Sequence, residues 1–136
     1  MRRFCLIFVV LLAMTACKQE SMVDRAAREA KEYTERMCPT PVYNDTRTDS
    51  VTFDKNSKTY TYHCSFLNTL DDSAAIASIK DKLHQQLQEA LIENTGIRAY
   101  KDADFSFCYI CRSAKNPKQI LYQDTFNSKQ INKAGN

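Results

Sequence analysis

Glycine and proline are scarce in this chain of 136 residues, which contains two glycines and three prolines. So few turn-forming residues leave little room for a flexible linker or a glycine-rich phosphate-binding loop. They also argue against an all-β sandwich, whose many short strands need frequent turns. The length itself favours a single domain.

A surplus of charge of one sign is lacking as well. Without its first sixteen residues, which include Arg2 and Arg3, the chain has 17 basic and 16 acidic side chains. No run of five like charges occurs in the sequence. This balance argues against a nucleic-acid partner.

The one long apolar run lies at the start of the chain. Met1 to Phe4 form a basic beginning, and Cys5 to Ala13 follow without a charge. The run is shorter than the roughly 20 residues that span a bilayer as a helix. This order is typical of a secretory signal peptide, which we place at residues 1–16.

The residues Thr15, Ala16 and Cys17 resemble the lipobox of bacterial lipoproteins, although Met14 stands where leucine is more usual. The resemblance implies cleavage before Cys17 and acylation of its thiol, palmitate included. Residues 17–21 would then tether the domain to a membrane. An ordinary signal peptide that releases a secreted protein is the alternative.

Lys18, rather than an aspartate, follows Cys17, which speaks against retention in the inner membrane and favours the outer membrane. The polar residues from Lys18 to Ser21 also resemble the surface-export signals of Bacteroidota lipoproteins, which are usually more acidic. The expected location is the cell envelope, with the periplasmic face and the cell surface both open.

Two amphipathic helices are predicted, because apolar residues recur every three or four positions over residues 22–37 and again over residues 73–93. Ser21 and the stretch Asp71 to Ser73 are suited to begin these helices, since their side chains accept hydrogen bonds from free backbone amides. Pro39 and Gly96 mark the two ends.

Strict alternation of apolar and polar residues predicts two β-hairpins. The first joins residues 51–53 to residues 59–66, and the second joins residues 105–111 to residues 119–126. The predicted fold is α+β in the order α-β-β-α-β-β, with two helices packed on one face of a four-stranded antiparallel sheet. Residues 22–126 form this domain, and the polar residues 127–136 are expected to be a frayed tail.

Three segments of the chain are similar to segments of a known group of proteins: Cys38-Pro39, the strand from Lys58 to Cys64, and the stretch from Tyr100 to Ile110. They resemble small uncharacterised α+β lipoproteins of Gram-negative bacteria. The resemblance covers nearly all of residues 22–126 and supports the fold. Because its motifs are mostly core alternation, it implies no catalytic residues.

Four cysteines lie beyond the lipobox: Cys38, Cys64, Cys108 and Cys111. An oxidising compartment permits two disulfides among them, in three connectivities. Cys64 and Cys111 both fall on apolar strand faces, so a bridge between them is conceivable, as is one from Cys38 to either hairpin. Buried free thiols are the alternative.

Cys108 and Cys111 also have the spacing found in thiol redox enzymes. Such pairs lie at the start of a helix, whereas strand alternation sends these two side chains to opposite faces. The same geometry counts against a zinc site with His63 or His84. We therefore expect no metal, no cofactor and no redox catalysis.

The remaining polar candidates have structural explanations. His63 falls on a polar strand face and His84 flanks the apolar stripe of a helix, and neither has a recognisable nucleophile nearby. The acid pairs Asp71-Asp72 and Asp102 with Asp104 fit a helix cap and a loop better than general acid–base chemistry or calcium binding.

An aromatic stripe is expected to form the core beneath the helices, with a ligand cleft as the alternative. It consists of Tyr60, Tyr62, Phe66, Phe105, Phe107 and Tyr109. The sequence thus favours a membrane-anchored lipoprotein that is not an enzyme and binds a protein partner. Open alternatives are an inhibitor or immunity protein against a toxin or hydrolase, and a lipoprotein that captures a small apolar ligand.

Overall fold

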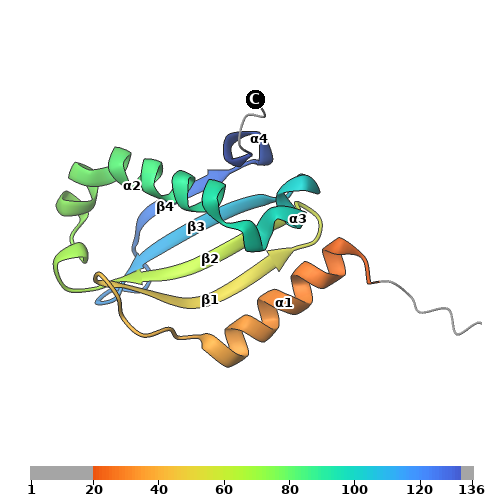
Figure 1. Ribbon diagram of the computed structural model, residues 1–136. Coiled ribbons are helices and arrows are strands. Elements are labelled where there is room, and N and C mark those ends of the chain that lie inside the picture. The colour runs from red at the N-terminus through yellow and green to blue at the C-terminus, as the bar shows by residue number, and fades with distance from the viewer. Residues whose placement is uncertain (1–19, 133–136) are drawn as a thin grey trace, which may run out of the picture.

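The computed structural model describes residues 20–132, which form a four-stranded sheet flanked by helices (Figure 1). The helices are α1 (Met22–Met37), α2 (Ser73–Glu93), α3 (Arg98–Asp102) and α4 (Ser128–Ile131). The strands are β1 (Thr46–Asp54), β2 (Thr59–Phe66), β3 (Ser106–Ser113) and β4 (Ile120–Phe126). Two 3-10 turns flank α2, namely η1 (Asn68–Leu70) and η2 (Thr95–Ile97). The signal peptide, Cys17 and residues 133–136 lie outside the described residues.

Both long helices have the predicted bounds, and their first turns show why. The Asp24 amide donates a hydrogen bond to Ser21 Oγ at 3.1 Å at the start of α1. At the start of α2, Asp72 Oδ1 accepts from the amides of Ala74 and Ala75. These side chains satisfy backbone amides that have no partner within the helix.

The sheet is mixed, so the predicted all-antiparallel sheet is wrong. The strand order is β1-β2-β3-β4, and the two outer pairs are antiparallel. The central pair, β2 with β3, is parallel. The reason is the length of the connection: α2 has 21 residues, which span about 31 Å, whereas the eight residues of β2 span about 26 Å. The helix therefore returns the chain to the end of the sheet where β2 began.

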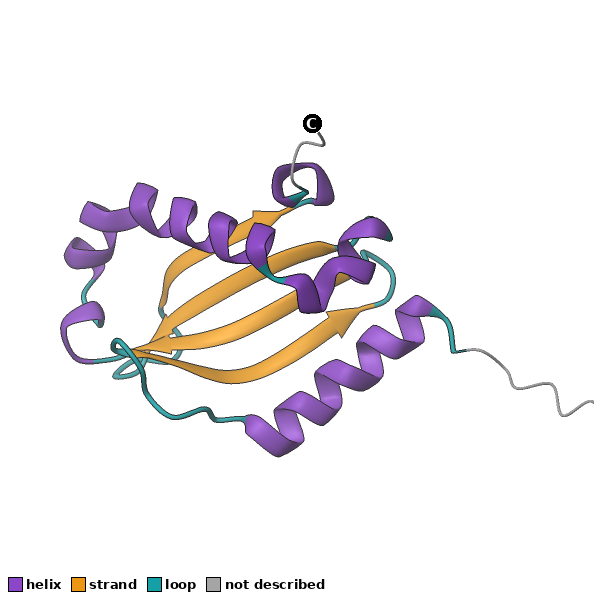
Figure 2. Ribbon diagram, in the orientation of Figure 1, coloured by secondary structure: helices purple, strands orange, loops and turns teal. Residues whose placement is uncertain are grey.

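Both long helices pack on the same face of the sheet. Ala26 and Ala30 of α1 and Leu91 of α2 belong to one core cluster, together with Tyr60, Phe107 and Phe126 of the strands. Figure 2 shows α1 lying along the β1 edge and α2 running on the β4 side. The predicted aromatic stripe lies in the core, as expected, with Tyr62 and Tyr109 half-buried. Its Phe66 belongs to a second core cluster, which also contains Cys64, Ile76, Cys111 and Tyr122.

Two short helices were not predicted, and one of them corrects the expected frayed tail. Ile131 of α4 is fully buried, and Asn127 and Gln130 form a capping box at the start of that helix. This pairing of an amide side chain with a glutamine three residues later was a readable signal for a helix start. The element order is therefore α-β-β-α-β-β-α when the short α3 is grouped with α2. Among residues 20–132, no helix is long and apolar enough to span a bilayer.

Candidate functional site

The sheet face opposite the helices carries mostly polar side chains, and its central feature is a group around Asp49. Arg47 Nε donates to Asp49 Oδ1 at 2.7 Å, and Ser65 Oγ donates to Asp49 Oδ2. Ser65 therefore directs its proton to a carboxylate and not to His63. Ser65 thus lacks the contact with an imidazole that activates a serine as a nucleophile.

His63 lies on this open face, as the alternation of its strand predicts. Its Nε2 is 3.0 Å from Thr52 Oγ1, and its Nδ1 is 3.5 Å from Arg112 Nη1. Burial, and next the charge of Arg112, lower the pKa of His63 and outweigh the effect of Asp49. The lowered pKa favours the neutral imidazole, which suits a structural contact.

His84 has a specific partner that the sequence did not indicate. Its Nδ1 lies 2.5 Å from Asp124 Oδ2, and the same oxygen accepts a hydrogen bond from the Tyr122 hydroxyl at 2.5 Å. The imidazole also stacks on Phe126. These contacts fix α2 on β4, and no serine or cysteine takes part in them.

The four cysteines predicted as candidates occupy different environments, and all four are free thiols. Cys64 and Cys111 face each other on β2 and β3 and are buried beneath the helices. Cys108 is buried too, but it pairs in register with Thr61, whose side chain is on the other face. The Cys108–Cys111 pair thus points to opposite faces of one strand and cannot form the redox motif.

Asp71, Asp72 and Asp104 have the structural roles expected of them, whereas Asp102 is the last residue of α3 and not part of a loop. Asp72 caps α2, and Asp71 Oδ2 accepts a hydrogen bond from the Lys115 amide at 3.0 Å. Asp104 accepts from Ser128 Oγ at 2.8 Å, which holds α4 in place. Within residues 20–132, no group of three or more histidine, cysteine or acidic side chains is arranged to hold a metal ion.

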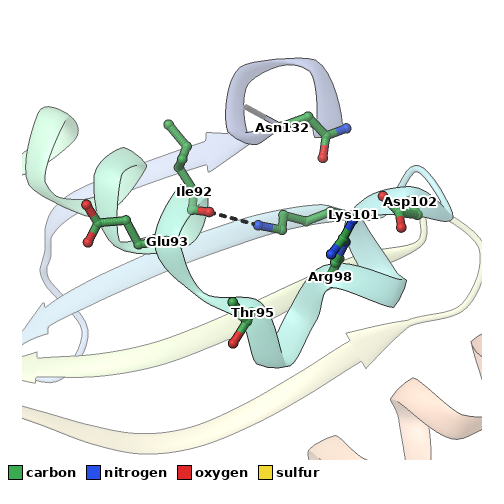
Figure 3. Close-up of a pocket in the computed structure, with 7 residues that line it drawn as sticks. All are labelled: Ile92, Glu93, Thr95, Arg98, Lys101, Asp102 and Asn132. Carbon is green, nitrogen blue, oxygen red and sulfur yellow. Dashed lines mark hydrogen bonds between the residues drawn. The ribbon is translucent and has the colours of Figure 1, made fainter. Parts of the chain in front are cut away.

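A cavity of about 420 Å³ lies where α2, α3 and the end of α4 meet (Figure 3). Lys101 occupies its wall and donates from Nζ to the carbonyls of Leu91 and Ile92 at 3.0 and 3.1 Å. The ammonium thus satisfies carbonyls that the last turn of α2 leaves free. Arg98, Glu93 and Asp102 complete a lining of mixed charge, which does not fit an apolar ligand.

Four of the five exposed large apolar side chains among residues 20–132 lie between residues 33 and 43, from the last turns of α1 to the loop before β1. Their exposed fractions are 40% for Tyr33, 57% for Met37, 48% for Val42 and 78% for Tyr43. We call these four residues the α1-end patch. Tyr33 and Met37 are one helical turn apart, so they lie on one face of α1.

A groove of about 240 Å³ begins next to this patch. It is lined by Asn44 and Thr46, by Phe66 and Leu70, and by Ile79, Lys82, Leu83 and Gln86 of α2. Most of the apolar lining comes from partly buried members of the second core cluster. A second groove of about 380 Å³ runs between α1 and β1, past Ala30, Thr34 and Val51.

Three solved structures share this fold. A protein from Pseudomonas aeruginosa assigned as secreted (PA3611) is 17% identical, with a TM-score of 0.64 over 83% of this chain and 99% of that one. The pilotin EpsS of the Vibrio vulnificus type 2 secretion system is 15% identical, with a TM-score of 0.62 over 80% and 90% of the two chains. The pilotin AspS of the Vibrio cholerae type II secretion system is 16% identical, with a TM-score of 0.57 over 78% and 88%.

These likenesses establish a common fold at low sequence identity. No curated protein sequence matches the chain. One family model does match, and it spans both long helices, the first hairpin, β3 and the first three residues of β4. The chain therefore belongs to the family described as Domain of unknown function (DUF8479), whose model matches residues 21–122.

Proposed function

We propose that this chain is a lipid-anchored accessory protein of the bacterial cell envelope, which binds a protein partner and catalyses no reaction. The observation that carries the proposal is the α1-end patch, where four large apolar side chains are exposed within eleven residues of sequence. Apolar groups gathered on a surface are typical of sites that bind another protein. The shared fold with two pilotins of type II secretion systems supports an accessory role in an envelope assembly.

The partner surface is expected to be an apolar segment of another protein. The aromatic rings of Tyr33 and Tyr43 give large contact areas at a small cost in side-chain entropy, which is why tyrosine is frequent at binding hot spots. The neighbouring groove adds Phe66, Ile79 and Leu83 as an apolar floor. A helix with apolar residues at every third or fourth position would place them along such a groove.

The polar sites favour binding over catalysis. Ser65 donates to Asp49, and His84 is bound to Asp124, so both groups are engaged in contacts that stabilise the fold. Each cavity described above is lined by mixed charges or opens as a groove. An enclosed apolar pocket is what capture of a small apolar ligand requires.

The membrane attachment is the part of the proposal that rests on the sequence pattern at Thr15, Ala16 and Cys17. Glu20 begins the described chain, and its carboxylate makes ion pairs with Arg28 Nε and Nη2 at 2.8 and 2.9 Å. An anchor at Cys17 would then lie three residues, or about 10 Å of extended chain, from Glu20, and five residues from the start of α1. The domain would be held close to the lipid surface.

The binding proposal is tested by site-specific photo-crosslinking in the envelope of cells that produce the full chain. A photoreactive amino acid at Met37 or Tyr43 is expected to capture the same partner, whereas one at Thr125 on the open sheet face is not. The variant Tyr43→Asp should reduce capture from Met37 at least tenfold, on the order of the loss expected for a hot-spot residue.

Ile120 supplies the matched control, because it is an apolar side chain of similar exposure on β4, away from the patch. Ile120→Asp should leave capture unchanged. Equal capture from Thr125, or equal losses in both aspartate variants, would show that the patch is not the binding surface. For the anchor, mass spectrometry of the mature protein should find acyl chains on Cys17, and Cys17→Ser should move the domain out of the membrane fraction.

A further inference from the structure

Cys64 and Cys111 lie directly opposite each other on the two central strands. They are register partners in the parallel pair of β2 and β3, and only 7% and 4% of their surfaces are exposed. Both belong to the second core cluster, beneath α2. Neighbouring strands are about 4.8 Å apart, which falls inside the range of Cα separations that a disulfide bridges, roughly 4.4 to 6.8 Å.

The two sulfur atoms interact in the thiol state. Their hydrogen bond is the largest cause of two opposite shifts: it lowers the pKa of Cys64 against the effect of burial, and it raises the pKa of Cys111, as burial also does. Because both thiols are buried beneath the helices, an oxidant reaches them poorly in the folded domain. Covalent chemistry at this pair has to take place while the strands assemble, before α2 closes over them.

We propose that Cys64 and Cys111 form a disulfide that joins β2 to β3. The oxidant is a protein or small molecule that itself carries a reactive disulfide, as is usual outside the cytoplasm. The thiolate of one cysteine attacks a sulfur of that disulfide, forms a mixed disulfide and releases one oxidant thiolate. The second cysteine thiolate attacks the mixed disulfide, which forms the Cys64–Cys111 bond and releases the second oxidant thiolate. Two cysteines are oxidised, one disulfide is reduced, and the two protons lost pass to the released thiolates.

The other two cysteines do not compete for this bond. Cys108 pairs with Thr61, which places its sulfur on the opposite face of the sheet. Cys38 follows α1, whereas the register partners of Cys64 are Thr48 on β1 and Cys111 on β3. The hydroxyl of Thr48 is 4.0 Å from Cys64 Sγ, so the β1 side chain in contact with Cys64 is that of Thr48.

The bond would act at the one place where the sheet is joined by a long connection. β1 and β2 are linked by a short turn, as are β3 and β4, whereas all of α2, η2 and α3 separate β2 from β3. A disulfide that closes a loop of this length strongly lowers the conformational entropy of the unfolded chain, and so stabilises the folded domain. Reduction of the bond is expected to lower the melting temperature by roughly 10 °C.

The test uses the full chain, produced with its own leader and recovered from the envelope in denaturant that contains an alkylating reagent. Trypsin separates Cys64, in residues 59–80, from Cys108 and Cys111, which share residues 102–112. The variant Cys108→Ser makes the second peptide report on Cys111 alone. Mass spectrometry without reductant is expected to find the two peptides linked, with the loss of two hydrogens.

Cys64→Ser should leave Cys111 alkylated, and the melting temperature of that variant should no longer respond to reductant. Alkylation of both residues in the processed chain, or a link from Cys64 to Cys38, would overturn the proposal. The oxidant is met only after the proposed export. A chain that keeps its leader has not been exported, so reduced cysteines in such a chain would count against export and not against the bond. In that case the disulfide is tested by refolding the full reduced chain with oxidised glutathione. If Cys64 and Cys111 do not become linked, the proposed disulfide is wrong.

Discussion

Two threonine side chains close the free edge of β1. Thr34 Oγ1 accepts a hydrogen bond from the Val51 amide at 2.8 Å and donates to the Val51 carbonyl at 2.9 Å. Thr40 Oγ1 accepts a hydrogen bond from the Thr48 amide at 2.9 Å, and the Thr40 backbone amide donates to the Thr48 carbonyl at 3.0 Å. An open strand edge is a template for pairing with another chain, so these bonds protect β1 from intermolecular pairing.

The substitution Thr34→Val tests this role at a single residue. Valine has nearly the same volume but no hydroxyl, so the amide and the carbonyl of Val51 both lose their partner. The free energy of unfolding should fall by about 2 kcal/mol, the usual range for partly buried groups left without a hydrogen bond. Urea denaturation followed by circular dichroism measures this.

Thr34→Ser is the control, because it keeps the hydroxyl and removes only a methyl group. Its loss of stability should be clearly smaller than that of Thr34→Val. If the two variants lost equal stability, packing of the methyl group rather than the hydrogen bonds would be the reason for the threonine.

At the scale of elements, α1 is held to α3 by one carboxylate. Glu29 accepts a hydrogen bond from the Tyr100 hydroxyl and pairs with Arg25 Nε at 2.8 Å. The Arg25 guanidinium also lies over the Tyr100 ring, 5.7 Å from its centre. Burial, the largest single effect, raises the pKa of Glu29, but the bonds from Tyr100 and Arg25 together outweigh it and lower the pKa from its usual 4.5.

This shift predicts a pH dependence with a definite sign. Because the folded pKa of Glu29 is below its unfolded value, the ionised carboxylate stabilises the fold above about pH 4.5. That contribution is lost as the pH falls through the lowered folded value. The variant Glu29→Gln should therefore be less stable than the original chain at pH 7, and the difference should shrink at pH 3.

Unfolding midpoints of both proteins at the two pH values provide the measurement. Glu35→Gln is a suitable control, because Glu35 is exposed and its one ion pair, with Lys31, is long at 3.9 Å. A stability difference for Glu29→Gln that does not change between pH 7 and pH 3 would contradict a role for the ionised group.

At the scale of the whole molecule, the described core runs from Met22 to Ile131. A chain that starts at Lys18 should therefore unfold cooperatively, as an intact domain does. A chain that also ends at Phe126 loses the buried Ile131 and the bond from Ser128 to Asp104. Its free energy of unfolding should fall by about 2 to 4 kcal/mol, the cost of removing a buried aliphatic side chain.

The matched control starts at Lys18 and ends at Asn132, so it keeps α4 and lacks only the last four residues. Calorimetry should give it the melting temperature of the chain that ends at Asn136. If the chain ending at Phe126 melted at that temperature as well, α4 would contribute nothing to the stability of the domain.

The local structure of this protein was readable from its sequence. The bounds of α1 and α2 follow from caps and from apolar spacing within a few residues, and the alternation from Tyr60 to Phe66 identifies β2 and its buried face. These signals are local because a helix turn or a strand pleat is determined by residues close together in the chain. The capping box of α4 carried the same kind of signal.

The direction of β3 and the arrangement of the sites depended on the tertiary structure. A buried strand has the same alternation whether its neighbour is parallel or antiparallel, so only the path of α2 decides the pairing of β2 with β3. The contact of Cys64 with Cys111 and the bond of His84 to Asp124 both follow from that path. The sequence by itself determined which segments form helices and strands, because those choices rest on near neighbours. Contacts between residues distant in the chain, such as that of Cys64 with Cys111, were decided by the tertiary structure, because those residues become neighbours only when helices and strands pack together.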